Sequence, residues 1–156
     1  MKLNENRIYD PIRQRNVLAL PEEIVRQNLL LKMTKHLGYP KSLIAVEKDL
    51  NKLDHLKNKD ITLKKRRADI ICFGKDIEPN YPLYPLLMIE CKADKLDQTT
   101  IDQVIGYNHL VEAYFLAIAN RYEIITYWYN IKESCYNSVN FLPSYDELIQ
   151  KVICKS

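Results

Sequence analysis

The sequence lacks the marks of a membrane-spanning, secreted or disordered protein. No apolar run among its 156 residues approaches the roughly 20 residues of a bilayer span. Residues 1–7 carry no apolar stretch of the signal-peptide kind. Only three glycines occur and 47% of the residues are hydrophobic, which argues against low complexity. We therefore expect one globular cytoplasmic domain over residues 1–156, with no room for a helicase motor, which another chain would have to supply.

Clusters of cysteine or histidine with metal-ligand spacing are also missing. The four cysteines lie far apart without a Cys-x-x-Cys pair, and the three histidines are scattered. A zinc site is therefore not expected. We interpret Cys72 and Cys91, which fall within expected strands, as small apolar fillers in a reducing compartment.

Charge of one sign is only slightly in excess, with a formal net charge of +3. This excess is too small to indicate a nucleic-acid-binding protein by itself. Its distribution is uneven, because Lys64, Lys65, Arg66 and Arg67 form one run just before Asp69. Such runs are often only solvated loops. The position of this one favours contact with phosphates, which would make binding dependent on salt.

Acidic residues interrupt two apolar segments that read as strands, at residues 67–73 and 86–92. Glu90 and Lys92 lie near the end of the second segment and share one face, because side chains alternate along a strand. Cys91 then points to the opposite, core side. If the two strands pair, an acid of the first strand can meet Glu90 at the edge of the sheet.

That acid is Asp69, which alternation places on the face opposite Ala68, Ile70 and Cys72. Two carboxylates can hold a hard divalent cation through oxygen, and a nearby ammonium can orient the attacking water. Asp69 and Glu90 are therefore the candidate ligands for Mg²⁺, with Mn²⁺ as a substitute. An acid-x-Lys pattern alone is a weak signal, since Glu and Lys commonly alternate on solvated strands.

The remaining elements follow from periodicity and breakers. A helix is expected over 21–37, because Pro21 suits a first helical position and Val25, Leu29 and Met33 form an apolar stripe. Further elements are expected as strands at 42–47, 114–119 and 124–129, and as helices at 98–112 and 145–153. We expect a polar loop or hairpin at 52–65, an irregular proline-containing turn at 74–85, and an extended arm or short hairpin before residue 20.

Several segments in this order resemble the PD-(D/E)xK nuclease superfamily, and more narrowly the N-terminal domain of type I restriction enzyme R subunits, here as a free-standing chain. The segments that carry the resemblance are Tyr9–Arg13, Leu20–Glu23, Val25–Gln27, Gly38–Pro40, Val46–Glu47, Arg67–Ile70, Ile89–Ala93, Gln103 and Tyr107–Asn108. The resemblance implies an α/β, restriction-endonuclease-like core at 21–129, in which a central mixed β-sheet is flanked by helices in the order αβββαβ. Residues 1–20 would form an arm and residues 130–156 a C-terminal extension with a helix.

The resemblance also implies roles for residues outside the acid-x-Lys motif. In this superfamily an acid on the first helix often points toward the metal through a water, and Glu23 matches that position. Glu23 equally suits the positive start of a helix. Gln103 and Tyr107 match a Gln-x-x-x-Tyr signature that is held to contact substrate near the metal. The same pair can also be an ordinary helix-surface pair with a half-buried ring.

Together these residues predict a Mg²⁺-dependent nuclease that hydrolyses DNA phosphodiester bonds, and we expect it to be an endonuclease. The main alternative is a module of nuclease fold that binds nucleic acid or assembles with a separate motor or restriction subunit without cutting. A third interpretation is an α/β protein whose acid-x-Lys is accidental. Because the chain carries no recognition domain, we expect any sequence preference to come from partners.

Overall fold

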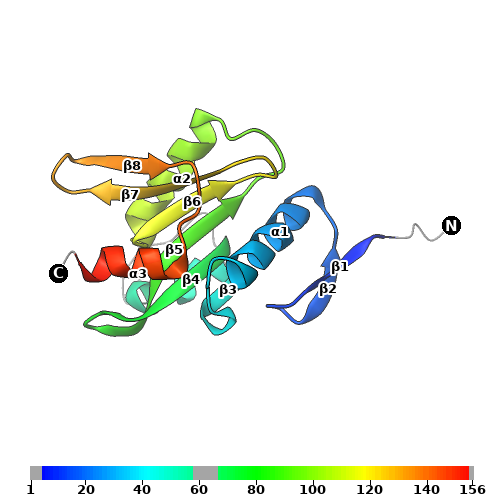
Figure 1. Cartoon of the computed structure of the whole chain (residues 1–156), viewed down its shortest axis with the longest axis horizontal. Coiled ribbons are helices and arrows are strands. Elements are labelled where there is room, and N and C mark those ends of the chain that lie inside the picture. Colours follow the sequence, from blue (N-terminus) through cyan, green and yellow to red (C-terminus); the bar gives the residue numbers. More distant parts are fainter. Residues whose placement is uncertain (1–4, 58–66, 155–156) are drawn as a thin grey trace.

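The computed structural model describes residues 5–57 and 67–154. These residues form three α-helices, three short 3₁₀ turns and eight strands (Figure 1). In chain order the helices and strands are β1 (Arg7–Asp10), β2 (Arg15–Leu18), α1 (Pro21–Lys35), β3 (Ile44–Asp49), β4 (Arg67–Glu78), β5 (Tyr81–Cys91), α2 (Gln98–Val111), β6 (Phe115–Ala119), β7 (Ile124–Asn130), β8 (Cys135–Val139) and α3 (Tyr145–Ile153).

The central sheet has six strands in the order β3-β4-β5-β6-β7-β8. All neighbours pair antiparallel except β5 and β6, which are parallel. Parallel neighbours need a crossover, and α2 supplies it. This mixed sheet with flanking helices is consistent with the restriction-endonuclease-like core expected from the sequence. The strand β8 at the edge was not predicted.

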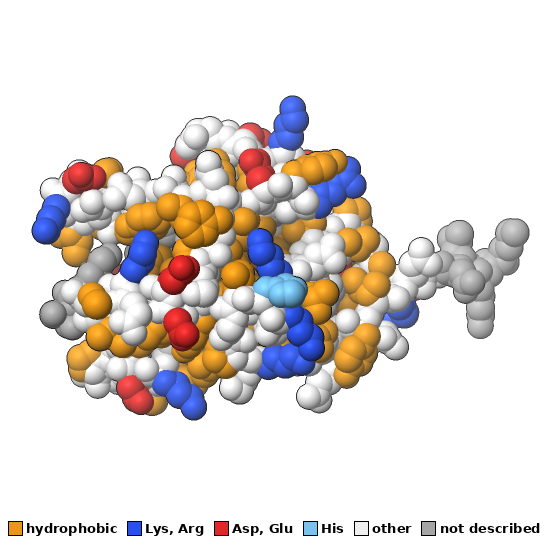
Figure 2. All heavy atoms as spheres, viewed as in Figure 1, with side chains coloured by type: hydrophobic (Ala, Val, Ile, Leu, Met, Phe, Trp, Pro, Cys, Tyr) orange, Lys and Arg blue, Asp and Glu red, His pale blue; other side chains and the backbone are white. Residues whose placement is uncertain are grey.

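Helices cover both faces of the sheet (Figure 1). On one face α1 and α3 pack over the main core, to which α1 contributes the predicted stripe of Val25, Leu29 and Met33 and α3 contributes Leu148. On the other face Val104 of α2 packs over β6. On the face viewed in Figure 2, acidic and basic side chains are interspersed among apolar ones. Of the helices in the described ranges, none is both long enough and apolar enough to span a bilayer.

The first helix forms much as its sequence predicts. Pro21 occupies its first turn together with two acidic residues, and two lysines lie in its last turn, so both ends complement the helix dipole. The helix ends at Lys35, two residues before the predicted end. Gly38 follows with φ of 70°, a left-handed conformation that glycine adopts without strain.

The prediction of an irregular turn at 74–85 was wrong. β4 and β5 continue through this segment as a long hairpin that closes at Pro79 and Asn80. β6 pairs with β5 only over Leu87–Cys91, so Pro82 and Pro85 lie where β5 has no strand on that side. Proline is tolerated at such an edge because no ladder partner requires its missing N–H group.

The segment before β4 is also more ordered than expected. Instead of a polar loop, residues 50–52 and 54–56 form 3₁₀ turns. The side chains of Leu50, Leu53 and Leu56 are buried in a hydrophobic cluster. Residues 58–66 lie outside the described part of the chain. Before α1, strands β1 and β2 form a short hairpin, which was one of the two structures expected there, the other being an extended arm.

Candidate active site

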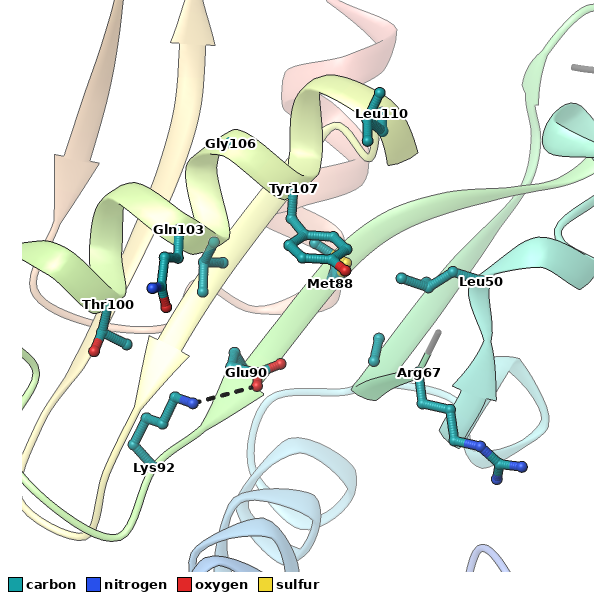
Figure 3. Close-up of a pocket in the computed structure, with 12 residues that line it drawn as sticks. Leu50, Arg67, Met88, Glu90, Lys92, Thr100, Gln103, Gly106, Tyr107 and Leu110 are labelled. Carbon is teal, nitrogen blue, oxygen red and sulfur yellow. Dashed lines mark ion pairs between the residues drawn. The ribbon is translucent and has the colours of Figure 1, made fainter. Parts of the chain in front are cut away.

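Glu90 and Lys92 lie at the end of the central strand β5 and face the same side, as alternation predicts. Glu90 is 8% exposed. The Lys92 ammonium lies 3.7 Å from a Glu90 carboxylate oxygen (Figure 3). The Lys92 N–H group donates to the Ala119 carbonyl at 2.8 Å, which fixes the residue beside the end of β6. Cys91, between them, belongs to the core on the opposite face.

A cavity of about 850 Å³ opens in front of Glu90 and Lys92. Gln103 and Tyr107 project into it from α2, so the helix places both members of the Gln-x-x-x-Tyr pair on the cavity side (Figure 3). The remaining wall is largely apolar and includes Met88. The cavity therefore has a polar end at Glu90 and Lys92 and a more apolar part around Met88, beneath Tyr107.

Asp69 lies beside the end of β5, but its carboxylate points away from this cavity. One oxygen accepts from the Arg26 guanidinium of α1 at 2.5 Å, and the other accepts from the Cys91 N–H at 2.8 Å. The side chain is 16% exposed. Asp69 is thus close to the backbone next to Glu90, yet it is bound from the α1 side of the sheet, whereas Glu90 faces α2.

Local strand pairing explains this placement. The β4–β5 ladder ends at Ile70 and Ile89, so Cys91 donates to the Asp69 side chain. On the other edge of β4, the register between β3 and β4 skips Glu47, whose φ is 52°. Regular pleating is therefore interrupted at Asp69.

The same interruption corrects the predicted alternation around Asp69. Ala68 does not share a face with Ile70 and Cys72, which pack in the core under α1. Ala68 instead packs with Ile71 and lines the cavity. The period-two rule holds along β5 but fails at Asp69, where the ladder to β5 has ended and no pair with β3 forms, although Ala68 and Arg67 still pair with β3.

Glu23 sits among arginines. Its carboxylate forms ion pairs with Arg13 and with Arg26, the latter at 2.6 Å, and accepts from Gln27 at 3.0 Å. Arg26 in turn pairs with Asp69. Glu23 is therefore linked to Asp69 through the Arg26 guanidinium. Neither of the two roles expected for Glu23, a water-mediated contact with the metal or a complement to the helix dipole, predicted this link.

Two further acids complete this charge network. Glu47 lies 3.4 Å from Arg13 and 3.6 Å from Arg26. Asp10 is fully buried and accepts from the Arg13 side chain and from the Arg13 N–H at 3.0 Å. No role was predicted for these two acids, although each lies in a segment that carried the family resemblance.

Burial and pairing act in opposite directions on the charges of this network. Burial alone raises the pKa of Asp10, but hydrogen bonds from Arg13 and Ile12 lower it below its ordinary value. Burial alone lowers the pKa of Arg26, but Asp69, Glu23 and Glu47 raise it above its ordinary value. Arg26 is therefore a permanent cation.

The predicted basic run is described only at its last residue. Arg67 is exposed at the start of β4 and borders the cavity, and in Figure 3 its guanidinium points away from Glu90. Lys64, Lys65 and Arg66 lie outside the described residues, so their contact with phosphate stays a prediction.

The cysteines near the site behave as the apolar fillers that were predicted. Cys72 and Cys91 are buried and form no disulfide. Burial raises the pKa of the Cys72 thiol to about 12. Burial and the nearby Asp69 carboxylate raise the pKa of Cys91. Both thiols therefore stay protonated, which makes them poor metal ligands.

The oxygen chemistry at this strand end fits a magnesium ion better than a softer metal. Asp69 and Glu90 offer two carboxylates from neighbouring strands. Magnesium commonly takes one or two carboxylates and keeps several waters. Residues 5–57 and 67–154 contain no group of three or more His, Cys, Asp or Glu that could hold an ion. An ion shared by Asp69 and Glu90 would have to compete with Arg26 for Asp69.

Comparison with known proteins identifies a family that covers most of the chain. Residues 21–143 match a family described as Type I restriction enzyme R protein N terminus. The matched range includes α1 and the whole central sheet, and it begins after the hairpin of β1 and β2. No curated protein and no solved structure matches the chain.

Proposed function

The chain belongs to the family of type I restriction enzyme R protein N-terminal domains, and from this premise we propose that it is a metal-dependent nuclease that hydrolyses DNA phosphodiester bonds. One observation carries the proposal. Glu90 and Lys92 face Gln103 and Tyr107 across a single cavity at the end of the central strands. A carboxylate, an ammonium, an amide and a phenol that converge on one concave surface mark a candidate active site, and a carboxylate beside an ammonium suits metal-assisted hydrolysis of a phosphate ester.

Each of these side chains has a task in the proposed reaction. Asp69 and Glu90 would hold Mg²⁺, which when bound activates a water and offsets the negative charge of the transition state. Lys92, held beside Glu90, orients the attacking water or stabilises charge on the phosphate oxygens. Gln103 and Tyr107 bind the substrate from the α2 side and hold its phosphate in front of Glu90.

Digestion of defined substrates tests the proposal. Linear, circular and single-stranded DNA, and RNA, are incubated with the purified protein with and without Mg²⁺ or Mn²⁺. We expect metal-dependent cleavage of DNA, and cleavage of circles because the enzyme cuts internally. Replacing Glu90 with Gln should lower the rate at least about a hundredfold, the order seen when one electrostatic partner of a transition state is lost. The exposed Glu133→Gln variant, in the β7–β8 turn, is the matched control.

Thermal melting of the same variants separates loss of chemistry from loss of fold. Glu90→Gln and Asp69→Ala should remain folded, and millimolar Mg²⁺ or Mn²⁺ should raise the melting temperature of the wild type more than that of Asp69→Ala, since an ion that binds only the folded site stabilises it. Full cleavage by either variant, or equal metal-induced shifts, would contradict the two-carboxylate site.

A second candidate function rests on the ion pair between Arg26 and Asp69. A guanidinium that neutralises a metal-binding carboxylate suits a module that binds DNA, or docks on a separate motor or restriction subunit, without cutting. The digestion decides between the two functions. Retention of DNA without cleavage under any metal condition would favour the binding module.

A further inference from the structure

Resting on the proposed nuclease function, we propose that Arg26 is a positioning residue that holds Asp69 while the metal is absent and yields it to the incoming cation. Arg26 is 5% exposed, and its two terminal nitrogens serve different partners. One nitrogen bonds to Asp69, and the other pairs with Glu23 and Glu47. The guanidinium therefore binds Asp69 through one nitrogen and is anchored to Glu23 and Glu47 through the other.

The charges of the network favour this exchange. Four carboxylates and two guanidinium groups are joined by ion pairs, which leaves an excess of two negative charges at this end of the sheet. The carboxylates are Asp10, Glu23, Glu47 and Asp69. This excess remains after the charges of both guanidinium groups are counted, and a divalent cation would neutralise it. Coulomb attraction thus draws a divalent cation toward Asp69 even though Arg26 already contacts it.

Release of Asp69 would leave Arg26 paired. The nitrogen that binds Glu23 at 2.6 Å is not the one that binds Asp69, so the first contact survives when the second opens. The Arg26 Nε is buried and bonds to no group of the described residues. A small rotation of the guanidinium would therefore break no Nε hydrogen bond. Most buried ion pairs are hard to open because one charge is left buried and unpaired. Arg26 avoids this cost because it stays paired with Glu23 and Glu47.

The hairpin before α1 fixes the other end of the network. Asp10, at the end of β1, accepts from the Arg13 side chain, and Arg13 holds Glu23. Arg13, in the turn of the hairpin, thus joins Asp10 of β1 to Glu23 of α1, and Glu23 is bound by both Arg13 and Arg26. These hairpin residues precede the range matched by the family. They anchor the carboxylate that retains Arg26 when Asp69 is released.

Metal binding without DNA tests the exchange directly. Free Mn²⁺ is measured by electron paramagnetic resonance in titrations of the wild type, Arg26→Gln, and the doubly substituted Arg26→Gln with Asp69→Asn. Arg26→Gln should bind Mn²⁺ at least about tenfold more tightly, because a competing cation beside Asp69 is gone. The gain should vanish in the double variant. Arg15→Gln, which replaces an exposed arginine of β2, is the control and should bind as the wild type does.

The outcomes separate this proposal from the proposed function. The exchange is supported if Arg26→Gln binds Mn²⁺ more tightly than the wild type and the double variant with Asp69→Asn does not. This holds even when the wild type binds no Mn²⁺. Equal binding by the wild type and Arg26→Gln, with loss in Glu90→Gln, overturns the exchange but leaves the nuclease standing. Absence of binding in both proteins overturns the exchange and the two-carboxylate site together.

Two further variants guard against loss of fold. Arg26→Gln combined with Glu23→Gln removes one charge of each sign and leaves the net charge of the network unchanged. It should show the same tighter binding, and unchanged binding in this variant would overturn the exchange. Arg26→Lys keeps the positive charge and should restore affinity to within a few-fold of the wild type. Tighter binding by Arg26→Lys would show that charge is not the competing factor and would also overturn it.

Discussion

Asn108 should determine how firmly α2 presents Gln103 and Tyr107 to the cavity. Its side chain is buried, donates to the Ala113 carbonyl at 3.0 Å and accepts from the Ala113 N–H at 3.0 Å. These bonds close the turn between α2 and β6, where Glu112 takes a left-handed φ of 59°. Replacing Asn108 with Ala removes both bonds and leaves the buried N–H and carbonyl of Ala113 unsatisfied.

The cost follows from these two orphaned backbone groups. Each buried unsatisfied group costs about 1 to 3 kcal/mol, so the two groups together should lower the free energy of unfolding of Asn108→Ala by about 2 to 6 kcal/mol. With a urea m-value of about 2 kcal/mol/M, the unfolding midpoint should fall by about 1 to 3 M. Asn16→Ala, at an exposed position of β2, should change stability by less than about 0.5 kcal/mol. A loss below about 0.5 kcal/mol in Asn108→Ala would refute the reasoning, since water would then satisfy Ala113.

Two other predictions concern charge. Asp10→Asn should destabilise the protein, and because hydrogen bonds lower the folded-state pKa of Asp10 below its ordinary 3.8, the stability it contributes is present above that value and lost as pH falls through the folded-state pKa. Urea unfolding of wild type and variant from pH 7 to pH 3 measures this, and a difference that grows toward acid would have the wrong sign. Replacing Lys64, Lys65 and Arg66 with Ser should weaken binding to every DNA sequence and lower the log-log salt slope by about 0.7 to 0.9 for each lost phosphate contact. An unchanged slope would mean that the run is a solvated loop and that substrate approaches from the Gln103 and Tyr107 side.

Periodicity was sufficient wherever an element keeps its partners. In β5 each residue from Leu87 to Cys91 pairs with β6, so alternation correctly placed Glu90 and Lys92 on one face and Cys91 on the other. The helical repeat of α2 likewise placed Gln103 and Tyr107 on the cavity side. Both results depend only on local geometry, which the residue spacing determines.

Periodicity failed where tertiary partners decide the structure. Prolines at 82 and 85 argue against a strand, and they are compatible with β5 only because β6 begins opposite Leu87, a fact of chain topology. Arg26 follows Val25 in a helix that reads as amphipathic, and its burial depends on acids from β3 and β4. Long-range ion pairs leave no periodic signal in the sequence, so the network was not predicted.

The break in pairing at Asp69 explains why the two candidate ligands approach the strand end from different sides. Within a regular ladder, Asp69 would stand opposite Glu90 and share its face. The ladder instead stops at Ile70 and Ile89, and Asp69 turns to the Cys91 N–H and Arg26. Because the Asp69 carboxylate is held by side-chain and N–H contacts rather than by strand pairing, rotation of the side chain can redirect it without disturbing the sheet. If Asp69 and Glu90 held one cation, the Asp69 side chain would have to turn toward Glu90, and its bond from Arg26 would have to open.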